Sequence, residues 1–385
     1  MLPFSYVIRN LFRAPSRMLQ TVGGSALVVL LVMAAVAINH GMRNVLSASG
    51  SPRNVILIGT GSEESIQRSE VPERSAGIAE ASVSGIAETL GERAVSSEIH
   101  YMNYLFFSDG SKVQALLRGV TPQALRVHPE VRLTKGRFPN AGEVMIGRLA
   151  WRKLGVSPAQ LEPGQEVVLD GQPLRISGQF AAPGTVMESE VWATLGDLRV
   201  LAKRESLSCV VLRLDDADDF TDAEVFVKQR LDLELSALRE SDYYSQLSDF
   251  FRPLRLMTWL TVGLVIIGAV FGGMNTLYAA FASRVREMAT LQAIGYGRGV
   301  LLLSLVQESI LACLAGTLLA SVVGLLLLDG VNIPFSIGAF TLQVSPTVAF
   351  TGLITGLLLG LLGALPPAIR CLKPELPVAL RTSDA

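Results

Sequence analysis

Four long runs of apolar residues, almost free of charge, dominate the pattern along the chain. They cover residues 18–42, 256–283, 299–328 and 346–369. Each run has the roughly 20 residues that a helix needs to cross about 30 Å of hydrocarbon. Residues 43–255, between the first two runs, are mixed in character like those of a soluble domain. The pattern therefore predicts an α-helical membrane protein with four transmembrane helices and a large insertion between the first and the second.

Basic residues beside the spans predict the orientation of the chain, because cytoplasmic segments of membrane proteins carry an excess of Lys and Arg. The basic residues in question are Arg9, Arg13, Arg17, Arg284, Arg286, Arg298, Arg370, Lys373 and Arg381. The loop at 329–345 has no Lys or Arg. We therefore expect both termini and the turn at 284–298 to be cytoplasmic, with the insertion and the short loop on the other side.

The segments expected in chain order are an amphipathic helix at 1–17, the first span at 18–42, the insertion with connecting helices at both ends at 43–255, the second span at 256–283, a short helix and turn at 284–298, the third span at 299–328, a loop at 329–345, the fourth span at 346–369 and a tail at 370–385. An alternative for the N-terminus is a signal peptide cleaved near Ala35-Val36-Ala37. The first run is long for a signal peptide and follows an amphipathic segment, which favours a retained anchor.

The insertion has the pattern of a mixed α/β domain. Its strands are expected at 54–58, 95–107, 112–120, within 131–147, at 165–180 and at 208–214, and its helices at 77–90, 148–154 and 220–243. Asp109-Gly110 and Asp170-Gly171 are hairpin turn signals between apolar runs. The last helix leads towards the second span with Pro253 between them. Two helical connections, after residue 42 and before residue 256, would thus join the insertion to the membrane.

Composition excludes several classes of function. A net charge of −1 provides no basic stripe for nucleic acid. Cys209, Cys313 and Cys371 fall in different segments, so no intrachain disulfide is expected. His40, His100 and His128 are scattered without ligand spacing, so we expect no metal site. No G-x-x-x-x-G-K-[ST] motif occurs, so we expect no bound cofactor in this chain. If energy is used, another polypeptide provides the ATP site.

Two pairs of acids precede a predicted helix, at Asp215-Asp216 and Asp218-Asp219. Acids in this position complement the positive end of the helix dipole and cap its free N–H groups. Capping is therefore favoured over a catalytic role.

The turn between the second and third spans has an ordered composition. Charged residues gather at its start, strong helix formers follow, and glycines end the helix. The residues concerned are Arg284, Arg286, Glu287, Leu291, Ala293, Ile294 and Gly295, to which the family resemblance described below assigns contact with an ATPase. The segment is expected to be a small helix on the cytoplasmic face of the membrane.

Two polar residues lie within predicted spans. Glu308 is nine residues past Gly299, up to about 13 Å along the helix. An acid at that depth is costly unless it is paired, and it is either functional or an interfacial side chain that reaches the head groups. Asn275, near Gly268, Gly272 and Gly273, favours helix packing over substrate contact.

Several of these features together resemble the MacB/FtsX-like permeases of the type VII ABC transporter superfamily. The residues concerned are Met274-Asn275, Arg284-Val285-Arg286-Glu287, Leu291-Gln292-Ala293-Ile294-Gly295, Glu308, Gly316, Leu365-Pro366-Pro367-Ala368-Ile369-Arg370, Pro374, Pro377-Val378-Ala379-Leu380-Arg381, Gly136-Arg137-Phe138, Gly142-Glu143-Val144-Met145-Ile146-Gly147, Leu154-Gly155 and Gly164-Gln165-Glu166-Val167-Val168-Leu169. The resemblance covers the whole chain and is to members without a fused ATPase. It implies a bacterial inner-membrane protein with a MacB-like periplasmic domain.

The resemblance also implies partners and a mechanism. Two permeases, identical or paralogous, would work with two ABC ATPase subunits, and a periplasmic adaptor and an outer-membrane channel are further expected partners. ATP-driven closure would move the helix at 286–294 and so the periplasmic domain, which is called mechanotransmission. The output would be efflux, lipoprotein release or export of another substrate. The alternative is an FtsX-like signal relay that activates a cell-wall hydrolase. An insertion of about 210 residues favours export, and no constellation supports a membrane enzyme.

Overall fold

The computed structural model describes residues 4–89, 91–335 and 338–374. By contacts the chain divides into two compact units. The helical unit comprises Met1–His40, Pro253–Val331 and Leu342–Ala385, and the inserted domain comprises Gly41–Arg252 and Asn332–Thr341. Residues 1–3 of the predicted first helix, Leu90 at the predicted end of a helix, and Glu375 to Ala385 of the predicted tail, with Pro377 to Arg381, lie outside the described residues.

Four helices of the described chain are long and apolar enough to cross a membrane, as predicted. They are α2 (Pro15–Ser49), α9 (Arg252–Ala282), α11 (Arg298–Leu327) and α12 (Pro346–Cys371). Two shorter helices, α1 (Phe4–Leu11) and α10 (Val285–Ala293), precede α2 and connect α9 to α11. The predicted N-terminal helix therefore ends at Leu11, and Pro15 opens α2. Pro suits a first helical position because its missing N–H would have no partner there.

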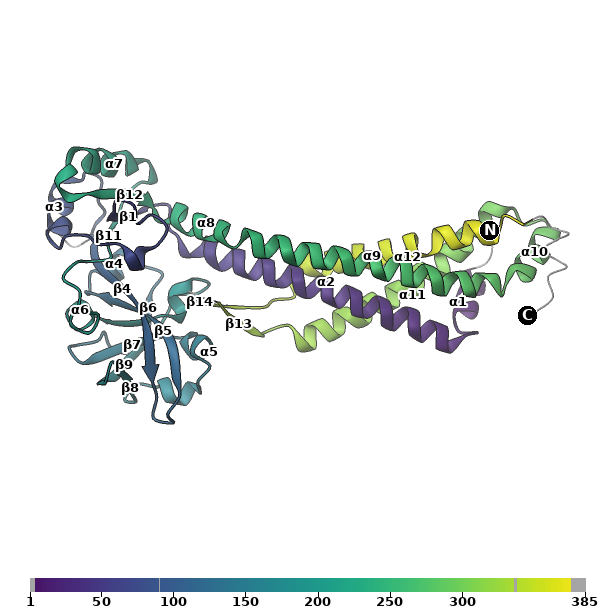
Figure 1. Cartoon of the computed structure of the whole chain (residues 1–385), viewed down its shortest axis with the longest axis horizontal. Coiled ribbons are helices and arrows are strands. Elements are labelled where there is room, and N and C mark those ends of the chain that lie inside the picture. The colour runs from purple at the N-terminus through teal and green to yellow at the C-terminus, as the bar shows by residue number, and fades with distance from the viewer. Residues whose placement is uncertain (1–3, 90, 336–337, 375–385) are drawn as a thin grey trace. The chain divides into compact units, whose positions relative to one another are not determined.

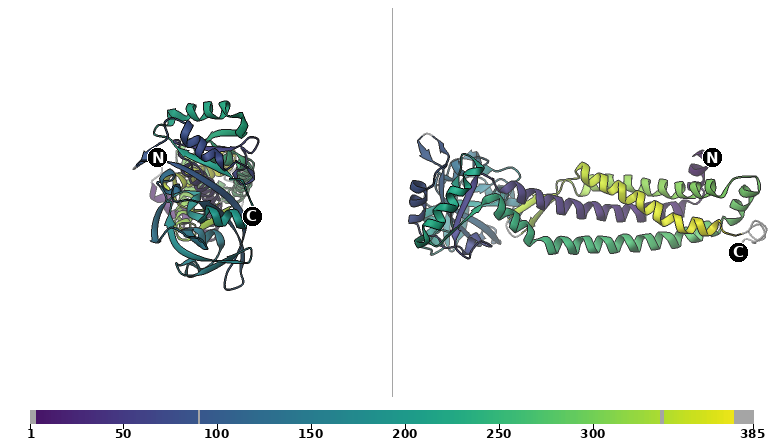
Figure 2. Two further views of the ribbon diagram at one scale, coloured as in Figure 1. Left: turned by 90° about the vertical axis from the view of Figure 1, so that its left-hand side faces the viewer. Right: turned by 90° about the horizontal axis from the view of Figure 1, so that it is seen from above.

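Close packing joins α2, α11 and α12, whereas α9 is largely exposed. An added Cβ at Gly316 of α11 would lie 2.1 Å from Ser25 Oγ of α2, and one at Gly356 of α12 would lie 2.0 Å from Thr317 Oγ1. Glycine is required at Gly316, because a Cβ there would also lie 2.6 Å from the backbone oxygen of Val22 in α2. Figure 2 shows α9 separate from the other long helices over most of its length (right view). Much of its apolar surface is thus left for lipid or a second polypeptide.

The inserted domain is built on a ten-stranded sheet (Figure 1). Its strands are β1 (Asn54–Gly59), β4 (Val95–Phe106), β5 (Lys112–Val120), β6 (Arg132–Gly136), β7 (Glu143–Gly147), β8 (Glu166–Leu169), β9 (Gln172–Ala181), β10 (Val191–Thr194), β11 (Cys209–Arg213) and β12 (Leu235–Arg239). The order is β12-β1-β11-β4-β5-β10-β7-β9-β6, and β8 pairs with both β4 and β9. The sheet is mixed, since β10 runs parallel to β5 and β7 runs parallel to β9.

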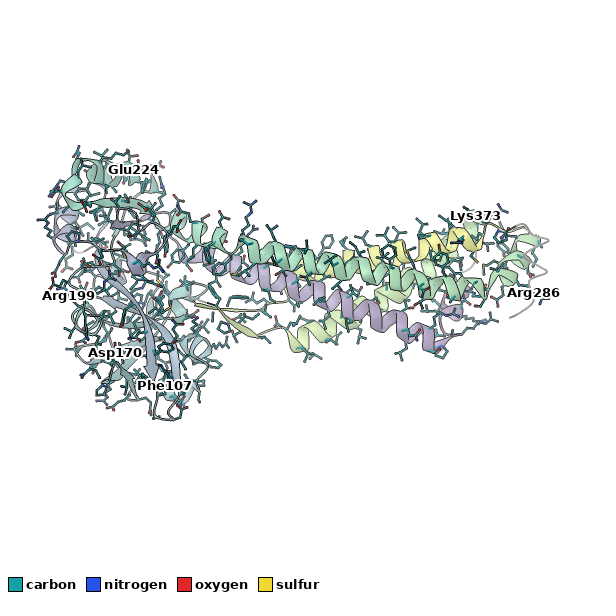
Figure 3. The ribbon with its side chains drawn as sticks, viewed as in Figure 1. Phe107, Asp170, Arg199, Glu224, Arg286 and Lys373 are labelled. Carbon is teal, nitrogen blue, oxygen red and sulfur yellow. The ribbon has the colours of Figure 1, made fainter. Side chains whose placement is uncertain are left out.

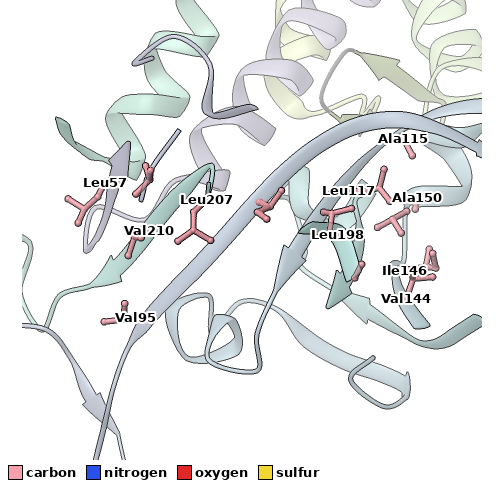
Figure 4. Close-up of a cluster of buried hydrophobic side chains, with 14 of the residues drawn as sticks. Leu57, Val95, Ala115, Leu117, Val144, Ile146, Ala150, Leu198, Leu207 and Val210 are labelled. Atoms are coloured by element: carbon pink, nitrogen blue, oxygen red, sulfur yellow. The ribbon is translucent and has the colours of Figure 1, made fainter. Parts of the chain in front are cut away.

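Helices and short turns surround the sheet. They are α3 (Arg74–Ser82), α4 (Ala124–Val127), α5 (Ala150–Leu154), α6 (Leu195–Leu201), α7 (Phe220–Gln229) and α8 (Glu240–Phe250), with the 3-10 turns η1 (Ile66–Arg68), η2 (Pro158–Leu161), η3 (Val186–Ser189), η4 (Ala217–Asp219) and η5 (Leu231–Leu233). A small ribbon pairs β2 (Glu88–Thr89) with β3 (Glu92–Arg93). Figure 4 shows apolar side chains of the sheet gathered in the core with Ala150 of α5 and Leu198 of α6.

Alternation along β4 gives the sheet two different faces. Val95 and Ile99 point into the large apolar core. Glu98 and His100, one residue out of phase, therefore point to the opposite face, and both are buried there. The second face thus carries charge although it is covered by protein.

Both predicted hairpins are confirmed. Asp109-Gly110 connects β4 to β5, and Asp170-Gly171 connects β8 to β9. In the second turn Asp170 has φ 49° and Gly171 has φ 80°. Positive φ at both central residues is the geometry that matches the twist of the flanking strands.

Two predicted helices of the insertion are wrong in extent. The helix expected at 220–243 ends at Gln229, because the next residues form η5 and then strand β12, which pairs with β1. The leucines at 231, 235 and 238 have helical spacing, but Glu234 takes a left-handed conformation with φ 50° and breaks the helix. The helix expected at 77–90 ends at Ser82, and Gly85 follows with φ 68°.

The short loop expected at 329–345 contains a hairpin that belongs to the inserted domain. Its strands are β13 (Asn332–Phe335) and β14 (Gly338–Thr341). Arg152 of α5 donates hydrogen bonds to the side chains of Asn332 and Thr341, and Ala339 N–H donates to Ser189 Oγ at 3.2 Å. Three segments of chain therefore connect the inserted domain to the helical unit, where the sequence predicted two.

Candidate functional site

An ion pair joins the turn after α9 to the third span. Arg284 Nη1 donates to Glu308 Oε2 at 2.9 Å, and the two side chains are only 10% and 15% exposed. Asn10 Nδ2 of α1 donates to the same oxygen at 2.6 Å. Glu308 is therefore paired within the helical unit. The sequence left open whether Glu308 is paired or reaches alone towards the lipid head groups. The contacts with Arg284 and Asn10 favour the paired arrangement.

The same cluster extends to the surface through Glu287 in the first turn of α10. Its carboxylate lies 3.4 Å from Arg284 Nε and 3.3 Å from Arg13 Nη1, and its side chain is 46% exposed. We call Asn10, Arg13, Arg284, Glu287 and Glu308 the basal cluster. It links α1, the turn before α2, α10 and α11.

The two faces of α10 have different environments. Met288 and Ala289 are buried, and Met288 packs with Leu301 and Leu305 of α11. Leu291 is half-buried and packs against the apolar cluster that contains Met288, Leu301 and Leu305. Ile294 is 71% exposed at the end of the helix.

The residues predicted to contact an ATPase are therefore divided into three groups. Arg284 and Glu287 belong to the basal cluster, and Leu291 faces the protein interior. The outward surface is formed by Arg286, Thr290, Ala293 and Ile294, followed by Gly295, which has φ 109° and ends the helix. Figure 3 shows Arg286 on this segment.

Asn275 and the glycines near it do not join the basal cluster. Asn275 is exposed on α9. A Cβ added at Gly268, Gly272 or Gly273 would meet no atom within 4 Å. Gly272 and Gly273 instead line a cavity of about 380 Å³ between α2, α9, α11 and α12. The helix packing predicted for these glycines is therefore not made with the described residues of this chain.

A second charged cluster is buried in the inserted domain. Arg118 of β5 donates two hydrogen bonds of 2.8 Å to Glu190, which immediately precedes β10, and one of 2.9 Å to Glu98 of β4. Each of these side chains is at most 3% exposed. Trp192 Nε1 donates to Glu190 Oε2 at 2.8 Å. Bidentate geometry and extra donors are what make a buried ion pair tolerable after desolvation.

His128 extends this cluster towards α8. Its Nε2 lies 3.1 Å from Glu98 Oε1, and its Nδ1 lies 3.5 Å from Glu130 Oε1 and 3.9 Å from Glu240 Oε1. Burial by itself would lower the pKa of His128, but the carboxylates of Glu130 and Glu98 outweigh it and raise that pKa to about 10. The imidazole is therefore cationic at neutral pH.

The strand register explains why these residues meet. His100 lies opposite Arg118, Arg118 lies opposite Trp192, and Cys209 lies opposite Glu98 on adjacent strands. The histidines at 100 and 128, which looked scattered in the sequence, both lie beside Glu98. The only sequence signal was an acid and a histidine two residues apart in one predicted strand.

Glu98, His100 and Cys209 also have ligand atoms within 4.8 Å of one another, a spacing that a metal ion could use. However, Arg118 and the cationic His128 already occupy both oxygens of Glu98. Burial also raises the pKa of the Cys209 thiol well above its usual value, which disfavours the thiolate that a metal requires. We therefore assign Glu98 and His100 to the ion-pair network rather than to a metal site.

The remaining candidates have structural roles. The Asp216 carboxylate accepts a hydrogen bond from Asp218 N–H and caps η4, as the capping interpretation predicted. Cys209, Cys313 and Cys371 are free, in agreement with their separation in the sequence.

Two family models match the chain. Residues 18–229, more than half of the chain, match the MacB-like periplasmic core domain. Residues 259–376 match the FtsX-like permease C-terminal domain. No curated protein matches the chain.

Parts of this chain also match solved structures. The periplasmic region of MacB from Actinobacillus actinomycetemcomitans is 14% identical, with a TM-score of 0.39, over 54% of this chain and 97% of that one. The extracellular domain of the noncanonic ABC-type transporter YknZ from Gram-positive bacteria is 15% identical, with a TM-score of 0.37, over 48% and 99%. A domain of a putative permease from Porphyromonas gingivalis is 13% identical, with a TM-score of 0.32, over 48% and 86%.

Proposed function

Because the chain belongs to the family of permeases that combine a MacB-like periplasmic core domain with an FtsX-like C-terminal domain, we propose that it is the membrane-spanning subunit of an ABC transporter driven by separate ATPase subunits. It is a multi-pass membrane protein, and we place it in the bacterial inner membrane with α10 in the cytoplasm and the inserted domain in the periplasm. Two copies, or one copy and a paralogue, would assemble with two ATPases.

One observation carries this proposal, namely the contrast between the two faces of α10. Its inner face is fixed to α11 by the Arg284–Glu308 pair and by the packing of Met288. Its outer face exposes Ile294 and Arg286. A short helix that is clamped on one side and open on the other suits the transfer of a push from a partner to the spans.

The proposed motion then follows the chain. Closure of the ATPases on ATP binding displaces α10, and the basal cluster passes the displacement to α11 and α1. The connecting segments carry it to the inserted domain, where it drives export or extraction of a substrate from the periplasm or the outer leaflet. The substrate would not need to pass through the spans.

Recovery of an ATPase with the purified chain tests the proposal. We expect an ABC ATPase to copurify from native membranes with the unmodified chain. Ile294→Asp should lower its recovery by about tenfold or more, since loss of a hot-spot side chain costs about 2 kcal/mol or more and each 1.4 kcal/mol is about tenfold in affinity. The matched control is Leu231→Asp, at a leucine of the inserted domain that is similarly exposed, 78% against 71%.

Absence of any ATPase from the unmodified complex would contradict the proposal. Equal recovery with both variants would remove the outer face of α10 as the contact surface.

A further inference from the structure

The three segments that connect the inserted domain to the helical unit each contact either a buried charge network within that domain or the turn η3 that precedes its Glu190. The segments are the end of α2, the start of α8 and the hairpin β13–β14. We propose that Glu240, His128, Glu98, Arg118 and Glu190 form a joint that fixes these three attachments to one another. The inference rests on the proposed function, in which the attachments carry motion to the domain. These residues are positioning residues and contact no substrate.

The first two attachments meet at Glu240. This side chain opens α8 and is buried. Its Oε2 accepts a hydrogen bond of 3.0 Å from Ser51 N–H, two residues after α2, and one of 2.9 Å from Asn54 Nδ2 of β1. A Cβ added at Gly50 would lie 2.6 Å from the Cα of Ser241. The two segments are thus in backbone contact and held by one carboxylate.

The third attachment meets the other end of the network. Glu190, held by Arg118, directly follows η3. Within η3, Ser189 Oγ accepts from Ala339 N–H of the hairpin, and Val186 N–H donates to Ser49 Oγ of α2 at 2.9 Å. The end of α2 is therefore tied to both ends of the network, at Ser49 and through Ser51.

Between these ends the charges form a continuous path. It runs from Glu240 to His128, from His128 to Glu98, and from Glu98 through Arg118 to Glu190. Glu98 lies 3.1 Å from His128 and 2.9 Å from Arg118. Arg118 lies 2.8 Å from Glu190, and His128 lies 3.9 Å from Glu240. In the low-dielectric interior the three hydrogen bonds from Arg118 to Glu98 and Glu190 fix the geometry of the inner part of this network. His128 Nδ1 has no hydrogen-bond partner among the described residues and faces Glu240 as an ion pair only. An apolar core of the same size would slide more easily because dispersion contacts have no fixed direction.

The cover over the network is α8 itself. Tyr243, Tyr244 and Leu247 of α8 line a cavity of about 30 Å³ together with His100, Arg118 and Glu190. Displacement of α8 would open this cavity to water and weaken the ion pairs, because water screens them. The network is therefore shielded from water only while α8 stays packed over it.

Amide hydrogen exchange on the full chain in detergent micelles tests the joint and requires neither ATPase nor substrate. The test variant is Glu240→Gln, which keeps the size of the side chain and removes its charge. The matched control is Asp242→Asn, the same change at an exposed acid in the same helical turn. A second test variant, Ser49→Ala, removes the acceptor of the Val186 amide without touching any charge.

We expect Glu240→Gln to accelerate exchange about tenfold or more in residues 49–54, because hydrogen bonds to a charged acceptor are among the strongest in proteins. The acceleration should also reach η3 and the hairpin β13–β14, while β6, at the far end of the strand order, stays unchanged. Ser49→Ala should accelerate exchange at η3 and the hairpin alone, and Asp242→Asn should change nothing.

Acceleration confined to α8 and residues 49–54 would overturn the proposal, because the network would then not link the attachments. Equal acceleration over the whole domain would also overturn it, since Glu240 would only support overall stability. A failure to find an associated ATPase would leave both exchange results interpretable, so the joint and the proposed function fail separately.

Discussion

Replacing Glu308 by Ala removes the carboxylate that Arg284 and Asn10 share, and leaves a cation that is 9% exposed. Breaking a buried ion pair from one side costs about 3–5 kcal/mol. We expect the lower limit, about 3 kcal/mol, because Glu287 remains as a partner 3.4 Å from Arg284. For a unit of this size, that corresponds to a fall in Tm of roughly 6–12 °C. Glu308→Gln keeps one acceptor and should cost only about 1–2 kcal/mol.

The double variant Arg284→Met with Glu308→Leu separates stability from coupling. Both charges are then replaced by apolar groups, which often restores or increases stability. We expect Tm to recover while ATP-driven activity stays lost, because the fixed link between α10 and α11 is gone. Thermal unfolding of the purified chain and ATP hydrolysis by the complex are the two measurements. A wild-type Tm for Glu308→Ala would refute the buried pair, and full activity of the double variant would show that the pair serves stability alone.

Three further results are expected. Leu291→Asp should lower the Tm of the chain as well as uncouple ATP hydrolysis from transport, since Leu291 packs inward. An unchanged Tm would place the Leu291 side chain on the outer face instead. The pKa of His128 is raised from 6.5 to about 10, so the stabilisation from its charge is fully present below pH 6.5 and is lost as the pH rises through about 10. The Tm should therefore fall between pH 7 and 10, and His128→Gln should make that fall smaller. A cysteine at Ser111 should react with an impermeant reagent in spheroplasts and one at Arg298 only after permeabilisation; equal reaction in intact spheroplasts would exclude the proposed orientation.

Properties that depend on neighbours in the sequence were predictable. The four spans follow from uninterrupted apolar runs, and the hairpins follow from Asp109-Gly110 and Asp170-Gly171, whose turn geometry is local. Glu308 was recognised as unusual because an acid within a span needs a partner. Arg284 lies in the turn between the second and third spans and is visible in the sequence as a basic residue. Its pairing with Glu308 was not predictable, because it depends on how α10 packs against α11.

Properties that depend on strand register were not predictable from one sequence. Strand β12 has leucines at helical spacing, and only its pairing with β1 makes it a strand. Glu98, Arg118 and Glu190 come from segments up to 92 residues apart, and a shift of one residue in any strand would separate them. The hairpin β13–β14 was missed for the same reason, because its partner is η3 rather than a neighbour in the chain.

The central claim is that motion passes from α10 to the inserted domain along stiff connections. At the end of α8 a single residue, Phe251, separates α8 from α9, and its N–H donates to Ser248 O at 3.2 Å. A flexible Gly-Ser segment inserted after Asp249 interrupts this connection, and the same segment inserted after Gly171, in an exposed hairpin turn, is the control. The measurement is the distance between spin labels placed at Ser111 in the two copies of the assembled transporter, with and without ATP. We predict an ATP-dependent change in distance in the unmodified and control complexes and none in the variant interrupted after Asp249, although that variant still hydrolyses ATP. The same change in distance in the interrupted variant, or no change in the unmodified complex, would contradict the claim.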